Sequence, residues 1–94
     1  MHIIERILGK HHAATLRVLR ALLLAKGPVT KYWVEKNSGV DDVNAILQRL
    51  IECGVVKVLS EYTPHRYEID RNNPLVKELE VFLARIGYLH ERMW

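Results

Sequence analysis

Apolar positions recur at helical spacing in the first half of the chain and alternate later, and these two periods predict the order of its elements. From Lys10 to Lys26 the apolar residues cover more than half of a helical circumference, which indicates a helix buried on several sides. Gly27 and Pro28 end it, because proline cannot continue a helix. The apolar residues within positions 1–8 fit either a helix or a strand.

The centre of the chain, residues 30–54, predicts two short helices joined by a turn. Thr30 would cap the first helix with its hydroxyl, and the glycine at position 39 tolerates the left-handed backbone that ends it. Asp41 or Asp42 would cap the second helix, which we expect to run from Asp41 to Cys53. One face of the second helix is apolar and must lie against a core: Val43, Ile46, Leu47, Leu50 and Ile51.

The opposite face of this second helix holds the first candidate binding residues. They are short or hydrogen-bonding side chains without bulky apolar groups: Asn44, Ala45, Gln48 and Arg49. Asn and Gln can bond adenine in a major groove and Arg can bond guanine, so this face suits DNA. The alternative is that this face is simply exposed to solvent and binds nothing.

After Gly54 the apolar period changes from 3.6 to about 2, which is typical of strands. Residues 55–59 and 67–70 predict the two strands of a β-hairpin, joined by turn residues. His65 and Arg66 lie at its tip, where a basic group would reach a phosphate or a minor groove. A solvated turn is the alternative for this tip.

Asn73 and Pro74 predict the start of a last helix that runs to the end of the chain. Its apolar residues step by four and three positions and form one seam: Leu75, Leu79, Phe82, Ile86, Leu89 and Met93. A small domain does not cover a helix of about twenty residues and about 30 Å. We therefore expect a homodimer through residues 74–94, with Tyr88 and Trp94 on this interface. Packing of the helix back on the first helix is the alternative.

The chain has 94 residues, enough for one domain but too few for a two-domain enzyme with a deep cleft. Its start lacks a secretory signal, and no apolar run is long enough to span a membrane. We expect a protein of the cytoplasm, or of the host cytoplasm if it is viral.

Charge is unevenly distributed along the chain. Residues 1–39 carry seven basic and two acidic side chains, whereas residues 40–94 carry seven basic and nine acidic side chains. Among the basic ones, Arg17 and Arg20 remain for solvent or phosphate.

Catalytic and metal-binding motifs are not evident. The five histidines lack the spacing of a metal site and are expected in solvent, and no serine or cysteine has a base nearby in a motif. We therefore predict no enzyme, no metal, no cofactor and no small-molecule effector. The single cysteine, Cys53, is expected as a half-buried apolar residue, with a disulfide to a second copy as the alternative.

Three stretches together resemble the winged helix-turn-helix family. VTKYWVEKNSGV is similar to the second helix of that family, ILQRLIECGVV to the end of its recognition helix, and RYEIDRNNPLVKEL to its closing wing strand and helix. The resemblance covers about two thirds of the chain and is nearest to small archaeal regulators of the ArsR/MarR-like type, cellular or viral. It implies a mostly α domain with a small β-hairpin, in the order α-α-α-β-β-α with a long C-terminal helix, within which residues 55–70 form the wing.

The resemblance also implies where DNA would lie. The residues that would face the major groove are Asp42, Asn44, Ala45, Gln48 and Arg49, and His65 and Arg66 would lie on the wing. We expect phosphate contacts from Lys31, Tyr32, Lys36, Arg49 and Arg66. The function expected is sequence-specific binding of double-stranded DNA by a dimeric transcriptional regulator.

The sequence departs from the family pattern at two places, of which the pair of aspartates weakens the case for DNA and Glu35 leaves room for an altered packing of the second helix. Asp41 and Asp42 stand where many relatives have Ser, Thr or a basic residue, and carboxylates repel phosphates. They serve as caps or accept a hydrogen bond from a cytosine amino group. Glu35 stands where relatives often have a small apolar residue. The alternatives are a winged-helix module for protein contact or assembly, or a non-specific DNA-coating protein, and salt dependence distinguishes DNA binding from protein binding.

Overall fold

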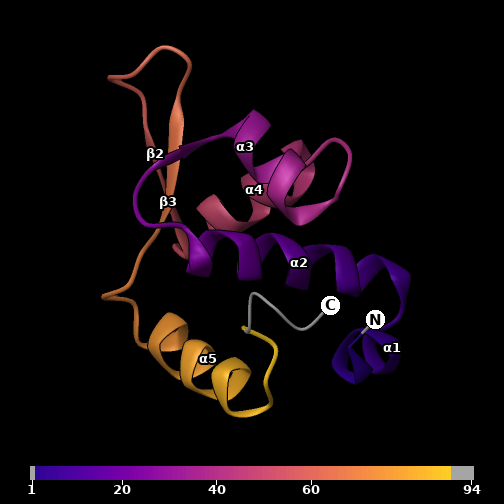
Figure 1. Cartoon of the computed structure of the whole chain (residues 1–94). Coiled ribbons are helices and arrows are strands. Elements are labelled where there is room, and N and C mark those ends of the chain that lie inside the picture. The colour runs from indigo at the N-terminus through magenta and orange to yellow at the C-terminus, as the bar shows by residue number, and fades with distance from the viewer. Residues whose placement is uncertain (1, 90–94) are drawn as a thin grey trace.

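The computed structural model describes residues 2–89, which form five helices and a small three-stranded sheet at one edge of the molecule (Figure 1). In chain order the elements are α1 (Ile3–Leu8), α2 (Lys10–Leu24), β1 (Val29–Thr30), α3 (Lys31–Ser38), α4 (Asn44–Glu52), β2 (Val56–Leu59), β3 (Arg66–Ile69) and α5 (Pro74–Arg85). The expected class, mostly helical with a small β-hairpin, is confirmed.

Helix α2 is the central element. In Figure 1 it crosses the middle of the molecule, with α3, α4 and the hairpin on one side and α1 and α5 on the other. Its buried residues lie on several sides, as the sequence predicts: Ala13, Leu16, Val18, Leu19, Ala21, Leu22 and Leu23.

The segment at positions 1–8, for which the sequence allowed either a helix or a strand, contains the helix α1. It is separated from α2 by Gly9, whose φ of 85° interrupts the helical path.

The sheet has the strand order β1-β3-β2, with antiparallel pairing throughout. The predicted hairpin is formed by β2 and β3, in which Val56 pairs with Ile69 and Leu59 with Arg66. Strand β1 was not predicted, because two residues are too few to show a period. It pairs Thr30 with Arg66 and so fixes the start of α3 beside β3.

The helix pair at the centre of the chain has the predicted caps. The backbone N–H of Trp33 donates to Oγ1 of Thr30 at 3.1 Å, and Gly39 ends α3 in the left-handed conformation with φ of 73°. The apolar stripe of α4 faces the core, since Val43, Leu47 and Leu50 are buried and its two isoleucines partly buried.

Helix α4 begins at Asn44, three residues later than expected. Asp42 has a φ of 48°, which a right-handed helix excludes. Its Oδ1 accepts from the backbone N–H of Asn44 at 3.2 Å, which satisfies one N–H at the start of α4. The preceding helix supplies another acceptor, because Oε2 of Glu35 accepts from the backbone N–H of Val43 at 3.3 Å. Glu35 thus holds the turn between α3 and α4.

Helix α5 starts as predicted but ends at Arg85, much earlier than the expected run to the end of the chain. Asn73 caps it through Oδ1, which accepts from the N–H of Leu75 at 2.8 Å. At the other end Gly87 has a φ of 82°, and the N–H of Tyr88 donates back to the carbonyl of Leu83 at 2.8 Å. This glycine-based cap closes the helix and reverses the chain.

The expected seam of α5 is therefore divided between two environments. Leu79, Ile86 and Leu89 are partly buried and pack against the core of the same chain, whereas Leu75 and Phe82 are exposed. The α5 residues at the centre of the core are Val76 and Leu83. Tyr88, expected on a dimer interface, is fully buried within the protomer. Met93 and Trp94 lie outside the described residues.

Candidate nucleic-acid interface

All residues predicted to face a major groove lie on the exposed side of the α4 region. Asp42, Asn44, Ala45, Gln48 and Arg49 are each exposed, and the buried stripe of α4 lies on the opposite side. The sequence missed one member of this surface. Glu52 is also exposed, one helical turn after Gln48, and its Oε2 accepts from Nε2 of Gln48 at 3.2 Å.

The predicted phosphate contacts on α3 are accessible. Tyr32 is 69% exposed, although aromatic side chains are usually covered, and Nζ of Lys36 lies 5.8 Å from the centre of its ring. Lys31 is half-buried at the start of the helix. Two cations and an aromatic ring therefore lie along one exposed helix of two turns.

The tip of the hairpin carries the second predicted group. His65 and Arg66 are exposed, and the guanidinium of Arg66 lies 4.9 Å from the centre of the Tyr62 ring. This stacking orients the guanidinium without neutralising its charge. Arg66 also begins β3, so its backbone is fixed by the sheet while its side chain projects from it.

A groove of about 600 Å³ connects these elements. It is lined by Thr30, Lys31, Tyr32, Asn44, Pro64, His65 and Tyr67. The start of α3, the start of α4 and the hairpin tip therefore share one concavity, since β1 holds the start of α3 against β3. Four of the ten predicted binding residues line this groove. The other six are not among its lining residues: Lys36, Asp42, Ala45, Gln48, Arg49 and Arg66.

Acidic side chains border the same surface. Asp41 and Asp42 are exposed before α4, and Glu52 is exposed near its end. One oxygen of Asp42 accepts from the backbone N–H of Asn44, although the N-cap position of α4 is Val43 and not, as expected, one of the two aspartates. These carboxylates reduce the positive potential available for a phosphate backbone.

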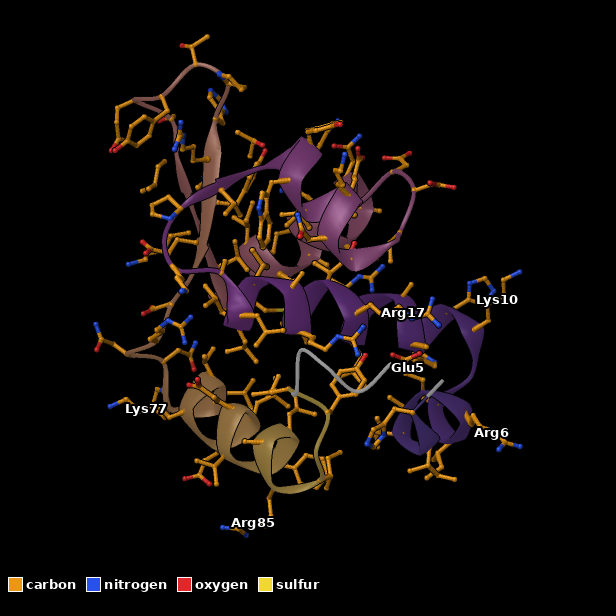
Figure 2. All side chains as sticks on the ribbon, in the orientation of Figure 1. Glu5, Arg6, Lys10, Arg17, Lys77 and Arg85 are labelled. Atoms are coloured by element: carbon orange, nitrogen blue, oxygen red, sulfur yellow. The ribbon has the colours of Figure 1, made fainter. Side chains whose placement is uncertain are left out.

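Arg17 is not available for phosphate, contrary to expectation. Its Nη2 and Nε donate to Oε1 of Glu5 at 2.8 and 3.0 Å, and Glu5 is almost fully buried at the contact between α1 and α2 (Figure 2). Burial raises the pKa of Glu5, but the hydrogen bonds from Arg17 and Tyr88 outweigh it and hold the pKa below the ordinary value of 4.5. The pair is a structural element of the fold.

The last residues described by the structure join the same cluster. The Oη of Tyr88 donates to Oε2 of Glu5 at 2.5 Å, and the guanidinium of Arg20 lies 4.5 Å from the Tyr88 ring centre. Burial and the bond to Glu5 raise the pKa of Tyr88. Arg20, like Arg17, is therefore engaged within the protomer, and the basic first part of the sequence does not form one open cationic face.

Two other expectations about single residues need correction. His2, expected in solvent, is half-buried: its Nδ1 accepts from the N–H of Ile4 at 3.1 Å, and its Nε2 lies 3.0 Å from the carbonyl oxygen of Ile86. Cys53, expected to be half-buried, is exposed with a free thiol because it lies in the turn after α4. His90 lies outside the described residues.

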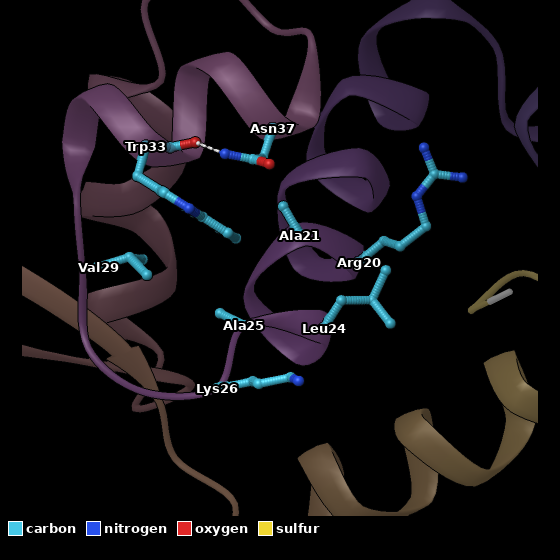
Figure 3. A pocket seen from close by; sticks show the side chains of 8 residues that line it. All are labelled: Arg20, Ala21, Leu24, Ala25, Lys26, Val29, Trp33 and Asn37. Atoms are coloured by element: carbon cyan, nitrogen blue, oxygen red, sulfur yellow. Dashed lines mark hydrogen bonds between the residues drawn. The ribbon is translucent and has the colours of Figure 1, made fainter. Parts of the chain in front are cut away.

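A second groove, of about 520 Å³, lies between α2 and α3 (Figure 3). Two small side chains, Ala21 on α2 and Ala25 directly after it, face Trp33 and Val29 across it, and Nδ2 of Asn37 donates to the carbonyl of Trp33 at 2.9 Å. It contains none of the predicted DNA-binding residues. The groove on the α4 side is therefore the better candidate site.

Residues 2–89 contain no cluster of three or more His, Cys, Asp or Glu side chains able to hold a metal ion. Within the same range no helix combines the length and apolar character needed to cross a bilayer.

A scan against protein-family models and searches of curated proteins and solved structures find no significant match to this chain.

Proposed function

We propose that this chain is a winged helix-turn-helix protein that binds double-stranded DNA and regulates transcription as a dimer. The observation that supports it best is the groove shared by the starts of α3 and α4 and the tip of the β2–β3 hairpin. A recognition helix and a wing that act on one duplex must be presented on one surface, and the shared groove at the start of α4 and the hairpin tip supports this requirement. The order of elements from α2 to α5 also agrees with the family that the sequence resembles.

In this proposal α4 lies in the major groove with its exposed face toward the bases. Asn44 and Gln48 are suited to adenine and Arg49 to guanine. Lys31 and Lys36 on α3 would contact phosphates on the same side of the duplex. Further phosphate or minor-groove contacts would come from the wing residues His65 and Arg66. The proposal includes no catalytic step, cofactor or metal.

The experiment that tests the proposal is selection of bound duplexes from a random pool by the purified protein at two salt concentrations. Enrichment of a motif at both concentrations would support sequence-specific binding. Retention without enrichment, lost at high salt, would replace it with non-specific coating of DNA, because that binding is dominated by phosphate contacts. Absence of retention at both concentrations would refute DNA binding.

A protein-contact module is the second candidate, and one observation favours it. Asp41, Asp42 and Glu52 place three exposed carboxylates beside the candidate DNA surface. Such a surface would suit a basic protein partner. The two functions differ in salt response, because each phosphate neutralised contributes about 0.9 to the slope of log affinity against log salt.

A further inference from the structure

Tyr32, on α3, has the most exposed ring among the Phe, Tyr and Trp residues at positions 2–89. Its exposed fraction is 69%, whereas Trp33, the next residue, packs against the core. Nζ of Lys36 lies 5.8 Å from the centre of the Tyr32 ring. A single exposed ring is ordinary on a protein surface, so its surroundings decide whether it belongs to a site.

The surroundings of this ring are concave. Tyr32 lines the groove of about 600 Å³, together with Pro64 and His65 of the hairpin tip and Tyr67 of β3. Two tyrosine rings, an imidazole and a proline ring therefore line one concavity. Its volume lies within the range of about 300–1,000 Å³ that is typical of sites for small organic groups. Lys36 is not among the lining residues, so it leaves the groove side of the Tyr32 ring uncovered.

The polar groups of the groove suit a nucleotide. Asn44, at the start of α4, offers an amide donor and an amide acceptor, which match the hydrogen-bonding edge of a nucleobase. Lys31 and His65 also line the groove and can donate to a phosphate. Aromatic rings beside such groups are the combination with which proteins bind single-stranded nucleic acid.

No carboxylate lines this groove, although acidic residues are present on the elements around it. Glu35 and Asp42 accept from backbone N–H groups in the turn before α4, at 3.3 and 3.2 Å. Glu68 follows Tyr67 in β3, and successive side chains of a strand point to opposite faces. Two more are exposed outside the lining: Asp41 and Glu61. An anionic ligand therefore meets Lys31 without an opposing charge among the lining residues.

The face of a tyrosine ring can stack only on a base that is not already stacked. Within a duplex each base is covered by its neighbours, whereas an unpaired base can turn outward and stack on an aromatic side chain. Tyr62, the other exposed tyrosine, does not line the groove, and its ring is covered by the guanidinium of Arg66 at 4.9 Å. Tyr32 is therefore the exposed stacking surface of the groove.

Asn44 connects the groove with the exposed face of α4. It lies on that face with Gln48, one helical turn later, and it also lines the groove. A base held in the groove would therefore lie next to a duplex under α4. This continuity favours an unpaired base within bound DNA over a free nucleotide.

We infer that the groove binds one unpaired nucleobase of DNA, stacked on Tyr32, beside the duplex that α4 contacts. Tyr32 would then contact a base instead of the expected phosphate. Lys31 and His65 would contact the phosphate of that nucleotide, and Asn44 the edge of its base instead of a base in the major groove. The inference rests on the proposed DNA binding and specifies its ligand, because a duplex interrupted by an unpaired nucleotide is preferred over a fully paired one.

The test measures fluorescence anisotropy with three duplexes of one sequence. The first is fully paired, the second has one unpaired adenine in one strand, and the third has an abasic residue at the same place, which is moved along the sequence. At the position that reaches the groove, we expect the affinity for the unpaired adenine to be about tenfold higher than for the other two duplexes. The abasic duplex has the same interruption without a base, so it separates stacking from flexibility.

Tyr32→Leu removes the ring from an exposed position. It should abolish the preference and leave the affinity for the fully paired duplex unchanged, whereas Tyr32→Phe keeps the ring and should keep the preference. Phe82→Leu is the matched control, because it removes an exposed ring from α5, on the other side of α2 (Figure 1). An unpaired 5-iodouracil in place of the adenine should crosslink to Tyr32 under ultraviolet light, as identified by mass spectrometry.

The outcomes separate this inference from the proposed function. Equal affinity for the unpaired and abasic duplexes at every position, a preference that survives Tyr32→Leu, or a crosslink outside the groove would overturn the stacking site while DNA binding stands. Binding of free deoxyadenosine monophosphate as tight as that of the unpaired duplex would overturn it in favour of a nucleotide site. Absence of binding to every duplex would refute the proposed function. A crosslink from a single strand to Tyr32 would then retain the groove as a base site, and its absence would refute both.

Discussion

The phenol of Tyr88 and the carboxylate of Glu5 form a buried hydrogen bond of 2.5 Å across 83 positions of sequence. Tyr88→Phe removes the donor and leaves a carboxylate oxygen buried without it. Since hydrogen bonds to charged groups contribute about 1.5–3 kcal/mol, we expect the free energy of unfolding to fall by about that amount in urea denaturation. Tyr62→Phe, on the exposed hairpin tip, is the control and should change it by less than about 0.5 kcal/mol. Equal effects of the two changes would contradict the structural role of Tyr88.

Acid should weaken the fold through Glu5. Its pKa is lower in the folded state than the ordinary value of 4.5, so the folded state favours the ionised form. This contribution to stability is present above about pH 4.5 and is lost as the pH falls through the lower folded pKa. Urea midpoints measured across this range should decline for the wild type. Glu5→Gln should be less stable at neutral pH and show a smaller decline, and an unchanged decline would assign the acid sensitivity to other carboxylates.

Glu35 should stabilise the turn between α3 and α4. Glu35→Ala removes the acceptor for the N–H of Val43, and we expect a loss of about 1 kcal/mol in the free energy of unfolding. Glu35→Gln keeps an acceptor oxygen and should retain most of the stability. If the two variants unfold alike, the hydrogen bond contributes nothing measurable.

Gln48 should affect sequence preference more than total affinity. Under the proposed function, Gln48→Ala removes one contact to a base edge, which is worth about 1–3 kcal/mol of discrimination. Competition between the selected duplex and a random duplex measures this difference. Asn72→Ala, a change of an exposed amide in the turn before α5, should leave the discrimination unchanged. Preserved discrimination in Gln48→Ala would mean that α4 does not read bases through this residue.

Arg66 should contribute affinity for every sequence. Arg66→Ala removes one phosphate contact, so the slope of log affinity against log salt should fall by about 0.9. The control is Arg85→Ala, because Arg85 lies on the far side of the molecule (Figure 2). An unchanged salt slope in Arg66→Ala would exclude the hairpin tip from the DNA contact.

Local sequence signals predicted much of the fold. The caps Thr30 and Asn73 and the left-handed Gly39 were predictable because each acts on the backbone within a few residues. The apolar stripe of α4 was predictable because a 3.6-residue period needs no knowledge of the partner surface. Asn44, Ala45, Gln48 and Arg49 lie on its exposed side for the same reason.

Features that depend on distant contacts were not predictable. The apolar seam of α5 continues in sequence through Ile86 and Leu89, but Gly87 ends the helix and sends Tyr88 to Glu5. Arg17 bonds to Glu5 across the contact of α1 with α2, and Arg20 lies over the ring of Tyr88, so the partners of both depend on tertiary contacts that helical periodicity does not reveal. A glycine within an otherwise regular heptad pattern was the one signal that favoured the shorter helix.

The short strand β1 has a consequence for how strongly the candidate surface can bind. Its two residues pair with Arg66 and Tyr67, so the start of α3 and the first residues of β3, next to the hairpin tip, are held by backbone hydrogen bonds. The conformational entropy of positioning these segments is lost when the chain folds. A partner that contacts both Tyr32 and His65 therefore meets a preorganised surface, and less of its binding free energy is spent on ordering the protein.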